Sequence, residues 1–400
     1  MVDGARIGAR LQELWQIARG PGGGADRPAY SSAEAEAIAL VARWAREADL
    51  APGLDEHGNL WALPAGWEGP LVTSGSHLDT VPDGGRYDGA LGTVLGLELA
   101  HELRRGTATG ARPGLLVCAA EEAPRFGAGT IGSRLLAGTL APAALSELRD
   151  ADGTTAAQAL SQYRSALTEL PAVAPPIARL RAHAEIHIAQ RRALREIGVV
   201  TRVASPQRME IELVGDAGHS GEVTMEDRRD ALAAAGEVVL AVERAARAEP
   251  RETVATVGTL ALAPGALSVI PAHVRLGLDA RGIDSTSLAR LDAAIRAAVA
   301  EIAARRGIEA QIRRLRTGEP VTLDGRLAGA ALDAARRRGI ATCETWSGAG
   351  HDAQHLAALT PTLLLFVPLH GGESHTPLED AAEREIADAA LLAVDVLDTV

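Results

Sequence analysis

Histidine and carboxylate residues cluster in the segment from Ser76 to Gly89, which reads SHLDTVPDGGRYDG. A histidine that binds a metal through one ring nitrogen needs its other nitrogen held, and Asp79, two residues after His77, can supply that carboxylate. Asp88 follows a glycine-rich turn and opens a predicted helix. An isolated His-x-Asp is more often an ordinary surface histidine, but the turn and Asp88 favour a metal site here.

Two adjacent carboxylates, Glu121 and Glu122, follow the apolar run Gly114–Ala120. Such a pair is unfavourable at the end of a buried strand unless a positive charge lies beside it, and a metal ion supplies one. Side chains of neighbouring residues at a strand end point in different directions, so one carboxylate can bind the metal while the other faces a bound water. An acidic loop start is the alternative interpretation.

Two further histidines lie beside predicted buried strands. His187 belongs to the alternating segment AHAEIHIAQ, in which His183, Glu185 and His187 share one face of a strand. His375 lies in FVPLHGGESHTPL, where glycines bend the chain after a buried strand and a proline and a predicted helix follow. His370, in the same segment, competes with His375 for the same role.

Hydrophobic periodicity predicts an α/β arrangement around these residues. The N-terminal part contains two helices, from about Ile7 and from Ser32, before the chain alternates between strands and helices. Its later elements are strand Gly69–His77, helix Asp88–Leu103, strand Gly114–Ala120, helix Gly325–Arg338, strand Pro361–Val367 and a final helix from about Leu378. Sites in open α/β sheets form outside the carboxyl ends of strands, where these histidines and carboxylates fall.

The chain between Pro206 and Gly318 follows a different order. Its predicted elements are strand Arg208–Val214, helix Asp227–Arg247, strand Thr253–Leu262, strand His273–Ala280, helix Ser285–Arg306 and strand Glu309–Leu315. The order β-α-β-β-α-β is ferredoxin-like. We therefore expect residues 206–317 to form an inserted α+β domain, and residues 1–205 and 318–400 to form one discontinuous catalytic domain with a mixed sheet flanked by helices.

Composition limits the class of partner. The 400 residues carry a net charge of −12, which argues against nucleic acid or an anionic membrane and favours a small-molecule substrate. No apolar run reaches the ~18 residues of a membrane span, and the N-terminus lacks a signal-peptide pattern. Only Cys118 and Cys343 are present, so a disulfide framework is not expected and a reducing, cytoplasmic location fits.

Taken together and in this order, the segments resemble one family of enzymes. The segments are GSHLDTVPDGGRYDGALG, EEAPRFGAGTIGSR, EIHIAQ, GHSG, DALAAAGEVVLAVE, LSVIP, LDAR, SGAGHDAQ and GGESHTP. The chain is similar over nearly its whole length to the binuclear-metal amidohydrolases that include N-carbamoyl-L-amino-acid hydrolases, allantoate amidohydrolases and β-ureidopropionases. These belong to the aminoacylase and carboxypeptidase G group of metallopeptidases.

The resemblance implies a centre with two divalent metal ions. One would be bound by His77, Asp88 and His187 and the other by Asp88, Glu122 and His375, with Asp88 bridging. Glu121 would be the general base for a metal-bridging hydroxide, and Asp79 would support His77. Ligands of this type accept Zn, Mn, Co or Ni.

The resemblance also assigns roles in the inserted domain, which it implies is a dimerisation and lid domain of a homodimer. His219 in GHSG would reach the partner subunit's active site and stabilise the oxyanion; a turn histidine is the alternative. Arg281 in LDAR would bind a substrate carboxylate through its planar fork. Gln190, Ser268 and His351 match further substrate-binding positions.

Three departures from the family pattern concern the substrate pocket. The family has an acidic residue and Gln-Gly-Pro after His-Ile, whereas this chain has Ala189-Gln190-Arg191-Arg192. Ser268 replaces the usual Asn, and the segment after His219 reads GEVT, with Glu222, instead of containing Thr-Thr-Pro. The two arginines favour an extra acidic group on the substrate or are solvated surface residues, and the substrate, the native metal and the stereospecificity stay open.

The predicted activity is hydrolysis of a linear amide or ureido C–N bond in an N-carbamoyl or ureido amino-acid-like substrate that carries a carboxylate. A dipeptidase or N-acyl-amino-acid amidohydrolase would use the same metals and mechanism with a different pocket. A catalytically silent binding homologue is the third possibility, and the presence of Glu121 beside all five ligands argues against it.

Overall fold

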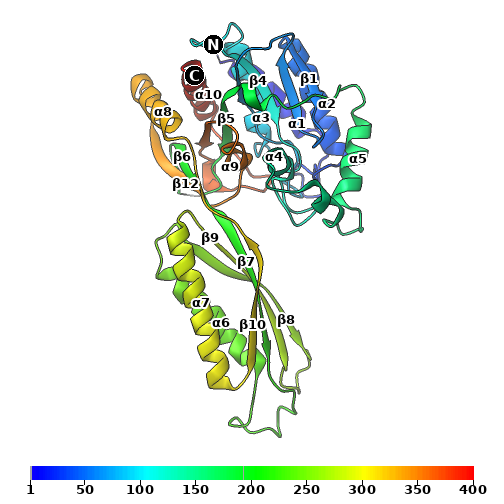
Figure 1. The fold of residues 1–400 in the computed structure, drawn as a ribbon, viewed down its shortest axis with the longest axis vertical. Coiled ribbons are helices and arrows are strands. Elements are labelled where there is room, and N and C mark those ends of the chain that lie inside the picture. Colours follow the sequence, from blue (N-terminus) through cyan, green and yellow to red (C-terminus); the bar gives the residue numbers. More distant parts are fainter. Residues whose placement is uncertain (1, 192) are drawn as a thin grey trace. The chain divides into compact units, whose positions relative to one another are not determined.

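The computed structural model describes residues 2–191 and 193–400, and these form two compact units (Figure 1). The main unit contains residues 1–201, 322–346 and 350–400, and the inserted unit contains residues 202–321 and 347–349. Within the described ranges, no helix combines the length and the apolar character that a membrane crossing requires. Each unit has its own hydrophobic core.

The main unit is built on a mixed sheet in the order β1-β2-β4-β3-β5-β13-β6-β11, with β12 paired to β6. The strands are β1 Leu50–Leu54, β2 Leu60–Pro64, β3 Leu71–Ser74, β4 Arg112–Val117, β5 Leu180–Ile188, β6 Ile197–Val203, β11 Val321–Thr322, β12 Thr342–Ser347 and β13 Thr362–Val367. The central strands β4, β3, β5 and β13 are parallel, and β1, β2 and β6 join them in antiparallel pairs. The carboxyl ends of the central strands therefore meet at one edge of the sheet.

Helices cover both faces of this sheet. Alternate residues divide between the faces: Val72 of β3 joins the large core beneath α3 (Ala90–Glu102), whereas Leu71 packs in a smaller cluster with Leu356 of α9 (Asp352–Leu356). Such alternation follows from the two-residue period of a strand. The predicted mixed sheet flanked by helices is confirmed.

The remaining helices of the main unit are mostly where the periodicity predicts them. They are α1 Gly4–Trp15, α2 Ser32–Glu47, α4 Ile131–Leu136, α5 Ala156–Ala166, α8 Gly325–Arg338 and α10 Glu383–Asp398. The last helix was expected from Leu378 but begins at Glu383, because Ala382 is extended (φ −70°, ψ 134°). The intervening residues form a turn that places Glu379 beneath two loops.

The inserted unit contains a four-stranded antiparallel sheet in the order β10-β7-β9-β8. Along the chain its elements are β7 Ser205–Val214, α6 Ala231–Arg247, β8 Val254–Ala263, β9 His273–Gly282, α7 Ser285–Arg306 and β10 Glu309–Thr317. This is the predicted β-α-β-β-α-β order, and α6 and α7 pack together on one face of the sheet (Figure 1). Helix α6 starts four residues later than expected, because Asp230 has an extended backbone and its side chain accepts the amide hydrogens of Leu232 and Ala233 as an N-cap.

Candidate metal centre

His77 lies just after β3, in a loop whose geometry is set by Asp79. The His77 Nδ1 atom is 3.0 Å from the main-chain oxygen of Asp79 and 3.6 Å from its carboxylate. The same carboxylate accepts the amide hydrogens of Glu121 (3.0 Å) and Glu122 (2.8 Å). Asp79 therefore orients His77 mainly through its carbonyl, while its carboxylate also holds the loop of the two glutamates. Sequence reasoning anticipated only the contact with His77.

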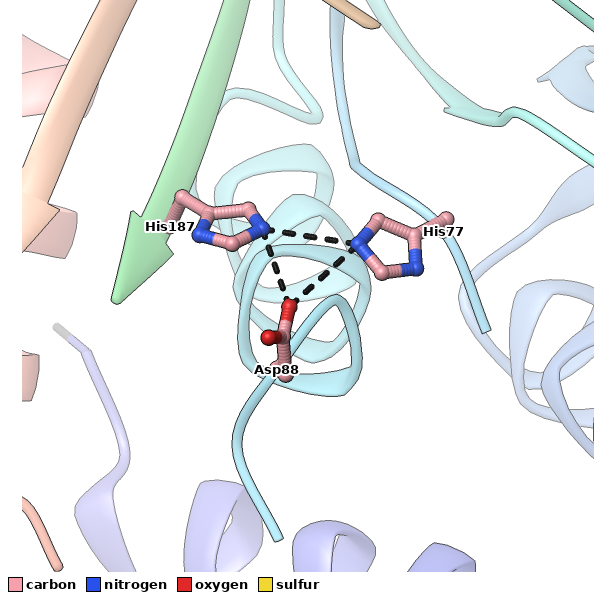
Figure 2. Close-up of side chains that lie close together, drawn as sticks. All are labelled: His77, Asp88 and His187. Atoms are coloured by element: carbon pink, nitrogen blue, oxygen red, sulfur yellow. Dashed lines mark hydrogen bonds and ion pairs between the residues drawn. The ribbon is translucent and has the colours of Figure 1, made fainter. Parts of the chain in front are cut away.

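Three side chains from different elements converge to form what we call the first ligand group: His77, Asp88 and His187 (Figure 2). The Nε2 atoms of the two histidines are 3.4 Å apart, and Asp88 Oδ1 is 3.4 Å from His77 Nε2 and 3.1 Å from His187 Nε2. His187 comes from β5, and Asp88 precedes α3. All three side chains are buried.

Close packing around His77 requires glycine at the start of α3. Gly89, the N-cap of that helix, has a φ of 63°, and a Cβ atom there would lie 2.5 Å from the His77 ring. Both the backbone conformation and the space therefore exclude other residues. This explains the glycine that follows Asp88 in the sequence.

The second ligand group consists of Asp88, Glu122 and His375. His375 Nε2 is 3.1 Å from Asp88 Oδ2 and 3.6 Å from Glu122 Oε1. Asp88 thus presents Oδ1 to one group and Oδ2 to the other. Its competitor in the sequence, His370, is exposed and pairs with Asp380 at 3.1 Å, so the fold brings His375 and not His370 to Asp88.

The spacing and chemistry of both groups fit divalent cations. Atoms about 2.1 Å from a common zinc ion at tetrahedral angles lie roughly 3.4 Å from each other, and the four histidine–carboxylate separations in the two groups are 3.1–3.6 Å. Imidazole nitrogens and carboxylate oxygens suit Zn, Mn, Co and Ni. The two groups could therefore each hold one cation, with Asp88 between them.

Strong electrostatic coupling marks the same residues. Burial acts to raise the pKa of Asp88, but the neighbouring histidines, His187 foremost, lower it well below its usual range. Contact with Asp88 raises the pKa of His375 to about 9. Burial, followed by the charge of Asp88, raises the pKa of Glu122 to about 7. Burial of several carboxylates in one cluster is unfavourable, and bound metal ions would neutralise their negative charge.

Glu121 points toward the same cluster without belonging to either ligand group. Its Oε2 atom is 4.0 Å from His77 Nε2, and the side chain is 11% exposed. Burial is the main cause that raises the pKa of Glu121 well above its usual value. The residue before it, Ala120, has a φ of 54°, so the backbone is left-handed just before the two glutamates.

Several predicted pocket residues lie around the cluster. Gln190 Nε2 is 3.3 Å from Asp88 Oδ2 and 2.9 Å from His375 Nε2, so this side chain spans the second ligand group. His351 is buried and its ring packs edge-on against His187 at 4.5 Å.

The residues after His187 that depart from the family pattern have different neighbours. Ala189 is buried at the end of β5, and the Arg191 guanidinium stacks over the Trp346 ring at 4.4 Å. Arg192 lies outside the described residues. Arg191 therefore contacts an aromatic ring, an arrangement that the sequence did not indicate.

The other predicted residues belong to the inserted unit. His219 and Ser268 lie on two loops that run side by side: His219 bridges to Val269, and the Ser220 amide donates to the Ser268 carbonyl at 3.0 Å. His219 is exposed, and its Nδ1 accepts the amide hydrogen of Gly221, which leaves Nε2 to act as a donor. Glu222 is exposed on the same loop.

Arg281 lies on β9 and is held by Asp279. The carboxylate accepts from Arg281 Nε at 2.8 Å and from Arg208 Nε at 3.0 Å, and Arg281 Nη1 also donates to the Gly348 carbonyl at 3.2 Å. Burial acts to raise the pKa of Asp279, but the two arginines lower it. The guanidinium is thereby fixed in direction, which favours recognition of a planar anion.

The sequence assigned no role to several buried carboxylates of the main unit, among them Glu34, Glu185 and Glu379. Glu379 accepts amide hydrogens from the Asp88 and His375 loops, Glu34 accepts those of Tyr30 and Ala120, and Glu185 accepts the Ser76 hydroxyl and the Ala353 amide. Glu379 lies four residues after His375 in an otherwise mixed segment, and Glu34 lies in the first turn of helix α2. A buried acidic residue looks like a surface one in sequence, so no clear signal distinguishes it.

Comparison with known proteins places these observations in a family context. Residues 74–399 match the model of peptidase family M20/M25/M40. The chain is 35% identical to an N-carbamoyl-L-amino acid amidohydrolase of Geobacillus stearothermophilus, covering 98% of this chain and 97% of that protein. An allantoate amidohydrolase of Bacillus subtilis is 29% identical, covering 97% and 95%.

A solved structure supports the same relationship. The crystal structure of an amidase of the hydantoinase/carbamoylase family from Burkholderia multivorans superposes with a TM-score of 0.87 at 34% identity, covering 100% of this chain and 98% of that chain. The similarity therefore extends over both units and is not limited to the ligand groups.

Proposed function

The chain belongs to peptidase family M20/M25/M40, and from this premise we propose that it is a binuclear metal-dependent amidohydrolase of N-carbamoyl or ureido amino acids. The observation that carries the proposal is the position of Asp88, whose two carboxylate oxygens face two separate ligand groups. The names of the relatives support C–N bond hydrolysis in carbamoyl and ureido compounds as the reaction class.

The proposed cofactors are two divalent cations held by His77, Asp88, Glu122, His187 and His375. When bound, such cations polarise a carbonyl and lower the pKa of a water molecule. The protein's contribution is to hold ligands from separate elements at the spacing that one cation in each group requires. The buried charge cluster supports this role, because cations would balance its carboxylates.

Glu121 is the proposed general base. Its carboxylate lies at the cluster but outside both ligand groups, so it is available to take a proton from the attacking water and return it to the leaving nitrogen. Asp79 holds the amides of Glu121 and Glu122 and so keeps both glutamates in position. Gln190 and His351 border the ligand groups, and we assign them to substrate contacts.

The inserted unit supplies the remaining proposed substrate contacts. We assign Arg281 to the substrate carboxylate, because Asp279 fixes its guanidinium. His219 is assigned to the oxyanion as a donor through Nε2, with Ser268 on the paired loop. These assignments follow the family pattern and the local geometry of the inserted unit.

A substrate panel tests the function directly. The holoenzyme would be assayed with N-carbamoyl, ureido, N-acyl and dipeptide substrates in the presence of Mn²⁺ or Zn²⁺. We expect turnover of a carbamoyl or ureido substrate, loss of it in Glu121→Gln with two cations per chain retained, and no loss in the control Glu36→Gln on the exposed side of α2. Activity confined to dipeptides or N-acyl amino acids would refute the proposed substrate class, and inactivity with cations bound would favour a binding protein.

We also propose that two copies associate through the inserted unit, at strand β8. The two edges of its sheet differ: β10 (EAQIRRLRT) carries charges, whereas β8 (VATVGTLALA) has none and exposes Val254, Leu260 and Leu262. Charged side chains protect an edge strand from pairing, and an uncharged edge invites it. An edge-to-edge pair of β8 strands would bury these side chains.

Size measurement by light scattering tests the homodimer. Leu260→Lys on β8 is expected to convert the dimer to a monomer, whereas Leu315→Lys on β10 is a matched control, since Leu315 is exposed to a similar extent (51% against 47%) on the opposite edge. A monomeric wild type, or a dimer that only the β10 variant disrupts, would refute the proposal.

A further inference from the structure

Glu379 connects two loops of the candidate metal centre. Its Oε2 atom accepts the amide hydrogens of Tyr87 at 2.9 Å and Asp88 at 3.2 Å, and its Oε1 atom accepts that of His375 at 3.0 Å. The residue is 6% exposed. One carboxylate thus holds the backbones of two residues whose side chains both belong to the second ligand group.

Both loops have backbone features that the surrounding structure must support. His375 has a φ of 58°, a left-handed conformation that is uncommon for a residue with a side chain and that the surrounding structure must maintain. Asp88 precedes the Gly89 N-cap of α3, which has no side-chain cap. Glu379 accepts hydrogen bonds from backbone amides of both loops and so holds the two conformations together.

The Asp88 loop is also shaped to admit this carboxylate. A Cβ atom at Gly85 would lie 1.7 Å from the Glu379 carboxyl carbon, so only glycine leaves the space that Glu379 occupies. The glycine-rich turn before Asp88 therefore accommodates a carboxylate from a residue 291 positions after Asp88 in the sequence.

We propose that Glu379 is a positioning residue that ties the Asp88 loop to the His375 loop and so sets the affinity of the second ligand group for its cation. The inference rests on the proposed function, because it assumes that both ligand groups bind cations. Glu379 acts through backbone amides and not as a ligand. Its loss should affect the second group more than the first, because His77 and His187 lie against the central sheet.

Titration of the metal-free, full-length protein with Zn²⁺ alone tests this role by calorimetry. Wild type should bind two equivalents. In Glu379→Gln the side-chain NH₂ group must face at least one of the backbone donors, so binding of the second equivalent should weaken by roughly 10–100-fold, as for other residues that orient metal ligands. The matched control is Asp380→Asn, which removes the neighbouring exposed carboxylate that pairs with His370 and should change neither equivalent.

A kinetic measurement separates positioning from catalysis. Saturating Zn²⁺ should restore most of kcat in Glu379→Gln, whereas Glu121→Gln should stay inactive. If Glu379→Gln does not fold, Glu379→Asp decides the matter, since its shorter side chain cannot reach both loops and should weaken the second equivalent.

The outcomes distinguish this inference from the function on which it rests. A wild type that binds fewer than two Zn²⁺ ions contradicts the proposed binuclear centre. Two equivalents in wild type, with affinities unchanged in the Glu379 variants, overturn the role of Glu379 and leave the binuclear centre intact.

Discussion

The two ligand groups share Asp88 but are held in different ways. In the first group, the side chains of His77 and His187 are only 1% and 2% exposed and lie at the ends of central strands. In the second group, the His375 side chain is 43% exposed and lies on a loop with a left-handed backbone. Packing in the sheet orients the first group, whereas backbone hydrogen bonds to Glu379 orient the second. The difference predicts that the two groups respond unequally to substitution and to chelators.

The largest effect is expected where the two groups meet. Asp88→Ala removes a ligand from both groups, so binding of both cations should be lost. Activity should fall by at least roughly 10⁴-fold, because a metal ion contributes several kcal/mol to transition-state stabilisation. Elemental analysis after dialysis and turnover measurements check this. Retention of two cations would mean that Asp88 does not join the groups.

A matched pair of histidine variants compares the groups directly. In the metal-free protein, His187→Ala should lower the free energy of unfolding by about 1–3 kcal/mol, because it leaves a cavity and removes one partner of the buried Asp88 carboxylate. His375→Ala should lower it by less than His187→Ala does, because the His375 side chain is 43% exposed and water screens its contact with Asp88. Chemical denaturation measures both. Equal losses would contradict the distinction between a core-held and a loop-held group.

Chelation tests the same difference in the wild type. Treatment of the holoenzyme with a chelator should remove the cation of the second group first. A difference of about 1.4 kcal/mol between the activation free energies of release corresponds to release rates that differ by roughly tenfold. The metal content followed over time should fall in two phases. A single phase would show that exposure of His375 has no consequence for metal release.

Asp279 in the inserted unit provides a comparison with Asp88, because its positively charged partners are arginine side chains and not metal ions. Its pKa is lowered in the folded protein, so its stabilising effect is present above the unfolded pKa of about 3.9 and is lost as the pH falls through the folded value. Asp279→Asn should lower the free energy of unfolding by less than about 1 kcal/mol near neutral pH, since the side chains of Asp279 and its arginine partners are about one-third exposed. The difference in the free energy of unfolding between this variant and wild type, measured by chemical denaturation, should shrink below about pH 4. A difference that persisted unchanged at pH 2 would argue against this charge effect.

Local pattern was sufficient for much of the fold. Apolar runs such as Gly114–Ala120 predicted the buried strands, and helical periodicity predicted α2, α3, α7 and α8, because these signals depend only on nearby residues. The limits of helices were less certain: a capping side chain at Asp230 and an extended Ala382 moved two helix starts. Helix α5, the edge strand β1 and its neighbour β2 carry no comparable signal and are not predicted.

The sequence by itself determined which chemistry is available: the His-x-Asp segment, the adjacent glutamates Glu121 and Glu122, and the alternation that points His187 from its strand. Only the tertiary structure decided that Asp88 divides its two oxygens between the groups, that His375 and not His370 reaches it, and that Glu379 ties two loops together. These contacts join residues as far as 292 positions apart. Their geometry depends on how parallel strands bring distant loops to one edge of the sheet, and no local pattern encodes that distance.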